Sequence, residues 1–228
     1  MCENISTFAV AKKYKKMIII FDLDGTLLNT IDDLGYACNY ALEQTHYPVH
    51  PIEAYPAKVG NGINNLIRRA LPAGEQTEAN IQKVREHFVP YYNVHNCDYT
   101  RPYEGIIEVL ETLKARGHRL AVASNKYQAA TEKIVGHFFP GVFDVILGER
   151  EGIERKPNPQ IVFDILARCP QETERMYIGD SLVDYETAKN AQVPFIGCSW
   201  GFVPLEQLQA AGIQTIVNHP KDILNHID

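Results

Sequence analysis

The sequence has little of what disulfide scaffolds, structural zinc sites or membrane helices need. Its five cysteines are scattered singly and form no Cys-x-x-Cys pair, which argues against a disulfide framework and a structural zinc site. The longest clear apolar run, Met17–Phe21, is far shorter than the roughly 18 residues that a membrane helix requires. These absences predict free thiols, no membrane span and a reducing, cytoplasmic setting.

The sequence also has fewer basic than acidic residues. The 228 residues include 22 Lys and Arg against 28 Asp and Glu, which gives a formal net charge of −6. A negative net charge disfavours broad binding to nucleic acids or anionic membranes, although a local positive site can still bind a small anion. The apolar fraction of 45% and the charged fraction of 22% are typical of a globular chain and argue against a disordered or fibrous one.

Short apolar runs alternate with amphipathic segments through much of the chain. Apolar residues recur at helical spacing in 104–116, 159–168 and 205–211, and the first and third of these segments are followed by a glycine, a common residue just past a helix end. The predicted strands are Met17–Asp22, Arg119–Ser124, Phe143–Leu147, Met176–Gly179, Pro194–Cys198 and Gln214–Val217. This alternation predicts an α/β fold with a Rossmann-like parallel sheet that is covered on both faces.

The interval between the first two predicted strands breaks this rhythm. A simple crossover takes a dozen or more residues, but this interval extends from Asp22 to Arg119 and has helical patterning throughout. We therefore predict a small helical cap inserted after the first strand, with Thr30 and Asp33 forming a capping box at its first helix. The predicted domains are an N-terminal extension at 1–16, a catalytic core formed by 17–29 and 99–228, and a cap at 30–98.

The segment Phe21–Thr30, FDLDGTLLNT, carries the strongest chemical signal. It places Asp22 and Asp24 at the carboxyl end of an apolar strand. Aspartate is disfavoured inside strands, and ligands of open α/β sheets bind at that edge. The pair therefore indicates either a ligand site or, taken alone, an Asp-Gly turn capped by Thr26.

Three later segments place polar residues at or just after predicted strands. Ser124 and Asn125 lie at the end of the second strand, where a hydroxyl and backbone N–H groups can hold phosphate oxygens. Lys156 precedes a proline in a loop, and Asp180 and Asp184 follow the fourth strand. Each segment alone has an ordinary explanation as a turn, a helix cap or a solvated charge. Together they predict acids, a hydroxyl and a lysine at one edge of the sheet.

In this order, the four segments resemble the motifs of the haloacid dehalogenase-like hydrolase superfamily, in its phosphatase branch. The resemblance covers roughly Met17–Val217, and the DxDGT pattern is its most specific part. It implies hydrolysis of a phosphate monoester with Mg²⁺ as cofactor. Asp24 separates the chain from dehalogenases, whose leaving halide needs no proton. The segments DGTLLNT, ASNK and KVGNGINNLIRRAL resemble phosphoglycolate phosphatases more than mutases.

The resemblance also implies a role for each matched residue. Asp22 would be the nucleophile that forms an aspartyl-phosphate, and Asp24 would protonate the leaving oxygen and then activate water. Lys156 would act in catalysis by offsetting negative charge. The other implied roles are phosphate binding by Ser124, Asn125 and Lys156, Mg²⁺ binding by Asp22, Asp180 and the backbone carbonyl of Asp24, support by Asp184, and cap specificity through Gly60, Asn61, Gly62 and Arg68.

The implied substrate is a small phosphorylated metabolite, with 2-phosphoglycolate as the first candidate. Pyrophosphate and sugar phosphates are alternatives, as is a sugar phosphomutase reaction. A non-catalytic binding protein with this fold is the alternative from another class, but every expected catalytic position is filled. No nucleic-acid or membrane partner is predicted, and the sequence does not distinguish a monomer from a homodimer.

Overall fold

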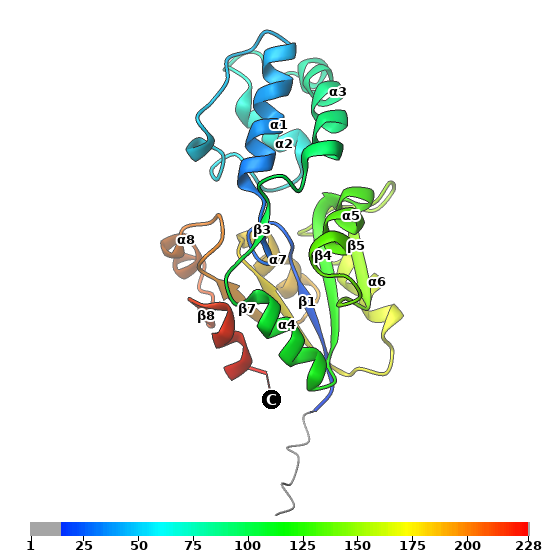
Figure 1. Cartoon of the computed structure of the whole chain (residues 1–228). Helices are drawn as coiled ribbons and strands as arrows, with labels where there is room; N and C mark the ends of the chain where they lie inside the picture. Colours follow the sequence, from blue (N-terminus) through cyan, green and yellow to red (C-terminus); the bar gives the residue numbers. More distant parts are fainter. Residues whose placement is uncertain (1–14, 228) are drawn as a thin grey trace, which may run out of the picture.

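The computed structural model describes residues 15–227, which form a core with a β-sheet and, above it, a helical cap (Figure 1). Of the N-terminal extension predicted for residues 1–16, only Lys15 and Lys16 fall within the described part. None of the helices between residues 15 and 227 is both long enough and apolar enough to cross a membrane. The cysteines in this part are free thiols, namely Cys38, Cys97, Cys169 and Cys198.

The core is built on a six-stranded sheet with the order β5-β4-β1-β6-β7-β8. All neighbouring strands in it are parallel. The strands are β1 (Met17–Phe21), β4 (Arg119–Tyr127), β5 (Val145–Glu149), β6 (Glu174–Gly179), β7 (Phe195–Cys198) and β8 (Ile216–Val217). The predicted α/β fold with a parallel sheet is therefore confirmed. β4 extends past the predicted end at Ser124, because Tyr127 pairs with Glu149 after a register shift.

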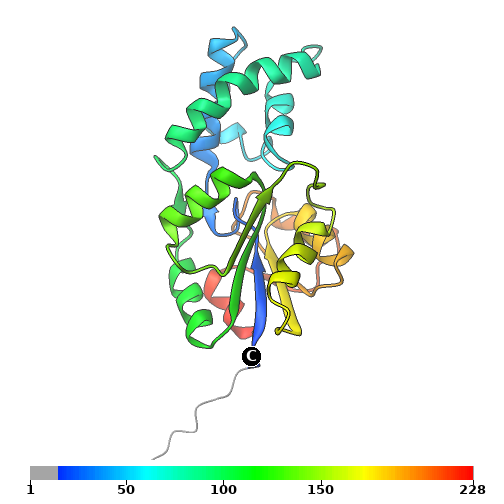
Figure 2. The same ribbon diagram turned by 90° about the vertical axis from the view of Figure 1, so that its right-hand side faces the viewer.

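Helices cover both faces of this sheet (Figure 2). In β1, Ile19 and Phe21 pack into the apolar cluster that includes α4 (Ile106–Ala115) and α5 (Gln128–Phe138), whereas Ile18 and Ile20 pack into a second cluster with α6 (Gln160–Arg168). All four side chains are fully buried, and each such burial contributes about 1.5–3 kcal/mol. The helical elements of the core are α4 (Ile106–Ala115), α5 (Gln128–Phe138), α6 (Gln160–Arg168), α7 (Leu182–Asn190), α8 (Leu205–Ala210) and the 3₁₀ helix η2 (Pro220–Asn225).

The cap lies between β1 and α4 in the sequence. It contains α1 (Ile31–Gln44), the 3₁₀ helix η1 (Ile52–Ala54), α2 (Ile63–Ala70) and α3 (Glu78–His95), and α1 packs against α3. Two short strands, β2 (Leu28–Asn29) and β3 (Arg101–Pro102), pair antiparallel where the chain enters and leaves the cap. Both connections therefore run side by side, as a hinge between two bodies requires (Figure 1).

The predicted capping box at α1 is wrong. Thr30 precedes the helix, but its side chain makes no cap hydrogen bond; its hydroxyl instead donates to Asp24 Oδ1 at 2.7 Å. The Asp33 carboxylate accepts from the backbone N–H groups of Tyr99 and Thr100 at 2.9 and 2.8 Å. Both side chains thus connect α1 to segments outside the helix, because tertiary partners compete for the same polar groups.

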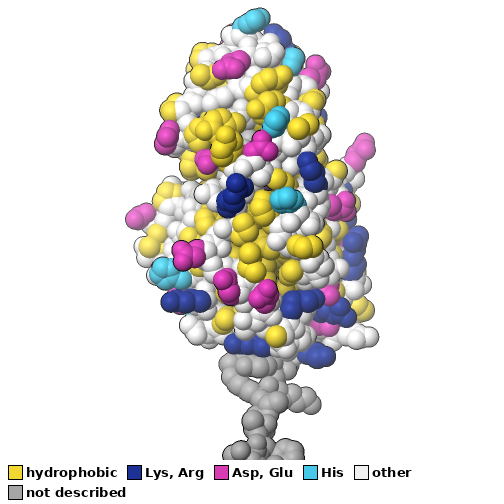
Figure 3. All heavy atoms as spheres, viewed as in Figure 1, with side chains coloured by type: hydrophobic (Ala, Val, Ile, Leu, Met, Phe, Trp, Pro, Cys, Tyr) yellow, Lys and Arg dark blue, Asp and Glu magenta, His cyan; other side chains and the backbone are white. Residues whose placement is uncertain are grey.

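Charged side chains of both signs are interspersed over the face of the molecule in Figure 3, on the cap and on the core. Hydrophobic side chains also reach the surface there, between the charged ones. On this face, neither sign of charge gathers into a single stripe.

Candidate active site

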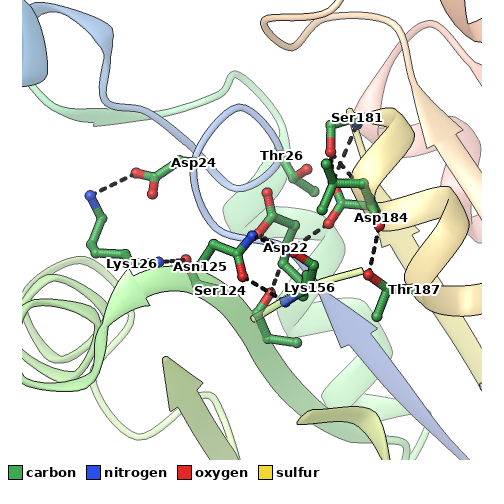
Figure 4. A network of polar contacts seen from close by, with 12 residues as sticks. Asp22, Asp24, Thr26, Ser124, Asn125, Lys126, Lys156, Ser181, Asp184 and Thr187 are labelled. Atoms are coloured by element: carbon green, nitrogen blue, oxygen red, sulfur yellow. Dashed lines mark hydrogen bonds and ion pairs between the residues drawn. The ribbon is translucent and has the colours of Figure 1, made fainter. Parts of the chain in front are cut away.

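Three neighbouring strands bring the predicted site residues together at the cap-facing edge of the sheet. Asp22 directly follows β1, Asp180 directly follows β6, and Ser124 lies near the end of β4. Because β4, β1 and β6 are adjacent and parallel, their carboxyl ends meet, as expected for the ligand-binding edge of an open α/β sheet. Figure 4 shows Asp22 and Ser124 in one group of polar side chains with Lys156 and Asp184.

Asp22 lies at the centre of this group and is almost completely buried. Its Oδ1 atom accepts a hydrogen bond from Lys156 Nζ at 2.6 Å. Burial and the neighbouring carboxylates of Asp184 and Asp180 raise the pKa of Asp22 well above its ordinary value, and the Lys156 charge acts against them. Added positive charge beside Asp22 would therefore favour its ionised form.

Lys156 is buried among four oxygen atoms. Besides Asp22, its Nζ donates to Asp184 Oδ1 at 2.7 Å, to the Ala123 carbonyl at 2.8 Å and to the Tyr177 hydroxyl at 3.2 Å. Burial lowers the pKa of Lys156, but the Asp184 and Asp22 charges outweigh burial and raise it above its ordinary value. Lys156 is therefore a fixed cation beside Asp22.

Asn125 positions the backbone of Lys156 from β4. Its Oδ1 accepts from the Lys156 N–H at 2.9 Å, and its Nδ2 donates to the Lys156 carbonyl at 3.1 Å. The neighbouring Ser124 is buried, and its Oγ accepts from the Lys126 N–H at 3.1 Å. Both polar atoms of the Asn125 side chain thus bond to the backbone of Lys156. The backbone N–H of Asn125 is therefore the group left for the predicted phosphate contact.

Asp180 is held by the loop after β1 and the loop after β7. Its two carboxylate oxygens accept from the Thr26 hydroxyl at 3.1 Å and from the Phe202 N–H at 2.8 Å. Burial and the Asp184 charge raise the pKa of Asp180 to about 7, although these hydrogen bonds lower it. A Cβ atom at Gly25 (φ +91°) or Gly201 would collide with the Asp180 carboxylate, so both glycines make room for it.

Asp184 is neither a surface acid nor a simple N-terminal charge. It is fully buried at the third position of α7. Its Oδ2 accepts from the Ser181 N–H and hydroxyl at 3.2 and 2.6 Å, while Oδ1 accepts from Lys156. One carboxylate therefore caps the helix and fixes the position of the lysine ammonium group.

Carboxylate oxygens of Asp22, Asp180 and Asp184 all lie within 4.8 Å of one another. Lys156 contacts two of these acids, and no basic side chain between residues 15 and 227 forms an ion pair with Asp180. Hard oxygen donors in an acidic, buried cluster are what Mg²⁺ and Ca²⁺ prefer. The residues present therefore fit a divalent cation. The predicted contribution of Asp24 is a backbone carbonyl, and its side chain lies outside this cluster.

Asp24 faces the opposite side of the site. Its Oδ1 lies 3.0 Å from Lys126 Nζ, which in turn donates to the Tyr92 hydroxyl at 2.7 Å. Sequence reasoning assigned no role to Lys126. The signal was present, because Lys126 is two residues beyond Ser124, and residues two apart on an extended strand share a face.

A cavity of about 1020 Å³ separates these residues from the cap. Of the predicted cap residues, Gly60, Asn61 and Gly62 line it and Arg68 does not, whereas the neighbouring Arg69 does. Arg68 hydrogen-bonds Asn65 Oδ1 at 2.6 Å and pairs with Glu78 instead. Neighbouring helical residues point about 100° apart, which is why only one of the two arginines faces the cavity.

Three further arginines on the cavity wall were not predicted, namely Arg85 on α3, Arg150 directly after β5, and Arg155 directly before Lys156. Arg150 forms an ion pair with Asp164 at 2.6 Å. The Arg155 guanidinium already has two partners, since it donates to the Asn61 carbonyl at 3.4 Å and lies 3.6 Å from Glu149. The buried Nε of Arg85 has no hydrogen-bond partner, and within residues 15–227 the side chain forms no ion pair. In the sequence, Arg85 is marked only by its charge within a helical stripe of apolar residues. That pattern does not distinguish a binding residue from a solvated one.

Comparison with known proteins agrees with this arrangement. The sequence model of the haloacid dehalogenase-like hydrolases matches residues 19–198, so the fold and site define an enzyme of the hydrolase class. A phosphoglycolate phosphatase of Aquifex aeolicus (strain VF5) is 34% identical over 82% of this chain and 87% of that protein. One from Haemophilus influenzae (strain 86-028NP) is 33% identical over 81% and 86%.

A solved structure agrees with this family assignment. A suggested phosphoglycolate phosphatase from Lactobacillus delbrueckii subsp. bulgaricus superposes with a TM-score of 0.86 at 34% identity, covering 92% of this chain and 97% of that one. The chain belongs to the haloacid dehalogenase-like hydrolase family, and the predicted membership of its phosphatase branch is confirmed.

Proposed function

We propose that this enzyme hydrolyses a small phosphorylated metabolite through an aspartyl-phosphate on Asp22, and that 2-phosphoglycolate is its substrate. The observation that carries the proposal is the buried contact between Asp22 and the fixed cation Lys156, at the floor of a cavity roofed by the cap. A phosphate dianion repels a carboxylate nucleophile, so a neighbouring permanent cation favours the attack.

In the first step, the Asp22 carboxylate attacks phosphorus while the bond between phosphorus and the leaving oxygen breaks. Asp24 gives its proton to that oxygen. In the second step, Asp24 takes a proton from the water that attacks the aspartyl-phosphate, which releases phosphate and restores Asp22. The Ser124 hydroxyl and the Asn125 N–H hold the phosphoryl oxygens during both steps.

A divalent cation, which we expect to be Mg²⁺, would be held by the Asp22 and Asp180 carboxylates and the Asp24 backbone carbonyl. When bound, it supplies positive charge that the three clustered acids and a phosphoryl group require. The raised pKa values of Asp22 and Asp180 support this need, because both groups are buried beside further negative charge. Asp184 supports the site by holding the Lys156 ammonium group.

The proposed substrate follows from the relatives and from the cavity wall. Relatives that match more than four-fifths of this chain are named phosphoglycolate phosphatases. Glycolate carries a carboxylate, and Arg85 lines the cavity without an ion-pair partner among residues 15–227. Arginine is suited to bind carboxylates through paired hydrogen bonds. We assign Arg85 to the carboxylate of the substrate.

Phosphate release with Mg²⁺ across a panel of 2-phosphoglycolate, pyrophosphate, sugar phosphates and nucleoside monophosphates tests this proposal. We expect the highest kcat/KM for 2-phosphoglycolate, loss of turnover on chelation with recovery on added Mg²⁺, and a fall of at least about 10³-fold in Asp22→Asn. Equal activity of Asp22→Asn and the parent would refute the assignment of Asp22 as the nucleophile. Conversion between sugar-phosphate isomers with little phosphate release would indicate a mutase instead.

A further inference from the structure

The acid–base residue of the proposed mechanism is held from two sides. Thr30, at the entry to the cap, donates to Asp24 Oδ1 at 2.7 Å, and Lys126 on β4 lies 3.0 Å from the same oxygen. Figure 4 shows the Asp24 side chain turned toward Lys126 and away from Asp22. The orientation of this carboxylate is therefore set by residues outside the DxDGT pattern that contains it.

Lys126 is itself held by the cap. Its Nζ donates to the hydroxyl of Tyr92 on α3 at 2.7 Å and lies 4.8 Å from the centre of the Tyr92 ring. Tyr92 is 1% exposed and stacks on Phe88 in the core of the cap, so its hydroxyl can move only with the cap. Burial lowers the pKa of Lys126, but Asp24 and Tyr92 outweigh burial and raise it, so the ammonium stays charged.

We propose that Lys126, held by Tyr92, is a positioning residue that makes the placement of Asp24 depend on the docked cap. The inference rests on the proposed function, in which Asp24 protonates the leaving oxygen. When the cap moves away, Tyr92 leaves with it, and Lys126 loses one of its two partners together with its burial. A reacting group misplaced by about 1 Å can lose about 10² in rate. Proton delivery is thereby linked to closure over a substrate.

Two other roles for Lys126 must be distinguished from this one. A lysine that bound the phosphoryl oxygens directly would affect all phosphate substrates alike. A lysine that only joined the cap to the core would also do so, because the closed state would be less populated for every substrate. A lysine that acts through Asp24 affects only substrates whose leaving group needs a proton.

Acetyl phosphate and ethyl phosphate provide the test, since they are similar in size and differ in leaving group. Acetate leaves as a stable anion, whereas ethoxide requires protonation by a general acid. We expect Lys126→Met to lower kcat/KM for ethyl phosphate about 10²-fold and for acetyl phosphate less than about 10-fold. The ratio kcat/KM reports the first irreversible step, so the later attack of water does not obscure the comparison.

Tyr92→Phe provides a milder variant that removes one hydroxyl and keeps the ring, in case Lys126→Met does not fold. It should shift the same ratio in the same direction by at least about 3-fold. The matched control is Asn93→Ala, because the neighbouring Asn93 side chain accepts from the Tyr127 hydroxyl and so also joins α3 to β4. That variant should leave the ratio of the two substrates unchanged.

Asp24→Asn separates failure of this inference from failure of the mechanism. It should show the largest selective loss on ethyl phosphate. If Asp24→Asn is selective but Lys126→Met and Tyr92→Phe slow both substrates equally, the positioning role is overturned and the mechanism stands. If Asp24→Asn also slows both substrates equally, the acid role of Asp24 fails and the inference falls with it.

Discussion

The side-chain amide of Asn125 pairs with both backbone polar groups of Lys156, accepting from its N–H at 2.9 Å and donating to its carbonyl at 3.1 Å. The two residues come from β4 and from the loop before α6. This double contact determines where the lysine side chain begins its path to Asp22. The site therefore depends on the side-chain amide of Asn125, although we do not expect this amide to contact phosphate.

Replacing that amide should loosen the lysine without removing it. We expect Asn125→Ala to lower kcat/KM about 10–100-fold and to destabilise the fold by about 1–3 kcal/mol, because two buried backbone groups lose their partner. Phosphate release and urea unfolding measure the two effects. Gln214→Ala, which removes an exposed amide hydrogen bond to the Gly212 carbonyl, is the control and should change neither quantity substantially. Full activity of Asn125→Ala would contradict the assigned role.

Arg85 should distinguish substrates by their carboxylate. Loss of a charge-assisted contact worth about 1.5–3 kcal/mol corresponds to about a 10–100-fold loss in binding. We expect Arg85→Met to raise KM for 2-phosphoglycolate by that factor and KM for ethyl phosphate less than about 3-fold. Arg68→Met is the control, since Arg68 pairs with Glu78 away from the cavity wall. Equal losses on both substrates would refute recognition of the carboxylate by Arg85.

The ionisation of Asp144 should make the stability of the fold depend on pH. Burial raises the pKa of Asp144, but hydrogen bonds from the Leu120 N–H, Arg119 and Lys114 outweigh burial and lower it below the ordinary 3.8. A depressed folded-state pKa stabilises the protein above the unfolded-state value, and this stability is lost as pH falls through the folded-state value. The contribution of Asp144 should thus be complete at neutral pH and decline below about pH 4.

Urea unfolding of Asp144→Asn against pH measures this contribution. At pH 7 the variant should be less stable by about 0.5–1.5 kcal/mol, because the amide cannot replace the charge-assisted hydrogen bonds and solvent screens the exposed ion pairs. The difference between variant and parent should shrink as pH falls below about 4, where the parent carboxylate takes up a proton. A difference that stays constant from pH 7 to pH 3 would show that charge plays no part.

Local patterns were sufficient to predict the strands of the parallel sheet and the order of the motifs, but not the short pair β2 and β3. The MIIIF run of β1 has no polar interruption, as a strand covered on both faces requires, and Asp22 follows it directly. Where the chain continued straight on, as from Ser124 to Lys126, the predicted end of the strand was too early. Pairing with β5 extends β4, and pairing partners are not visible in a single strand.

Side-chain partners were harder to predict than backbone elements. Thr30 and Asp33 have the spacing of a capping box, but their side chains bond to Asp24 and to the backbone at Tyr99 and Thr100. Helix capping and these tertiary hydrogen bonds have similar energies of about 1 kcal/mol each. Spacing alone therefore could not decide between them.

The class of this enzyme could be predicted from the order of its residues, because polar groups that follow the strands of a parallel sheet meet at one edge of it. The contacts that govern each group were decided only by the folded chain. Asp184 holds Lys156, and Tyr92 reaches Lys126 from the cap. Hydrogen bonds act over about 3 Å, and only folding brings residues so far apart in the chain within that distance.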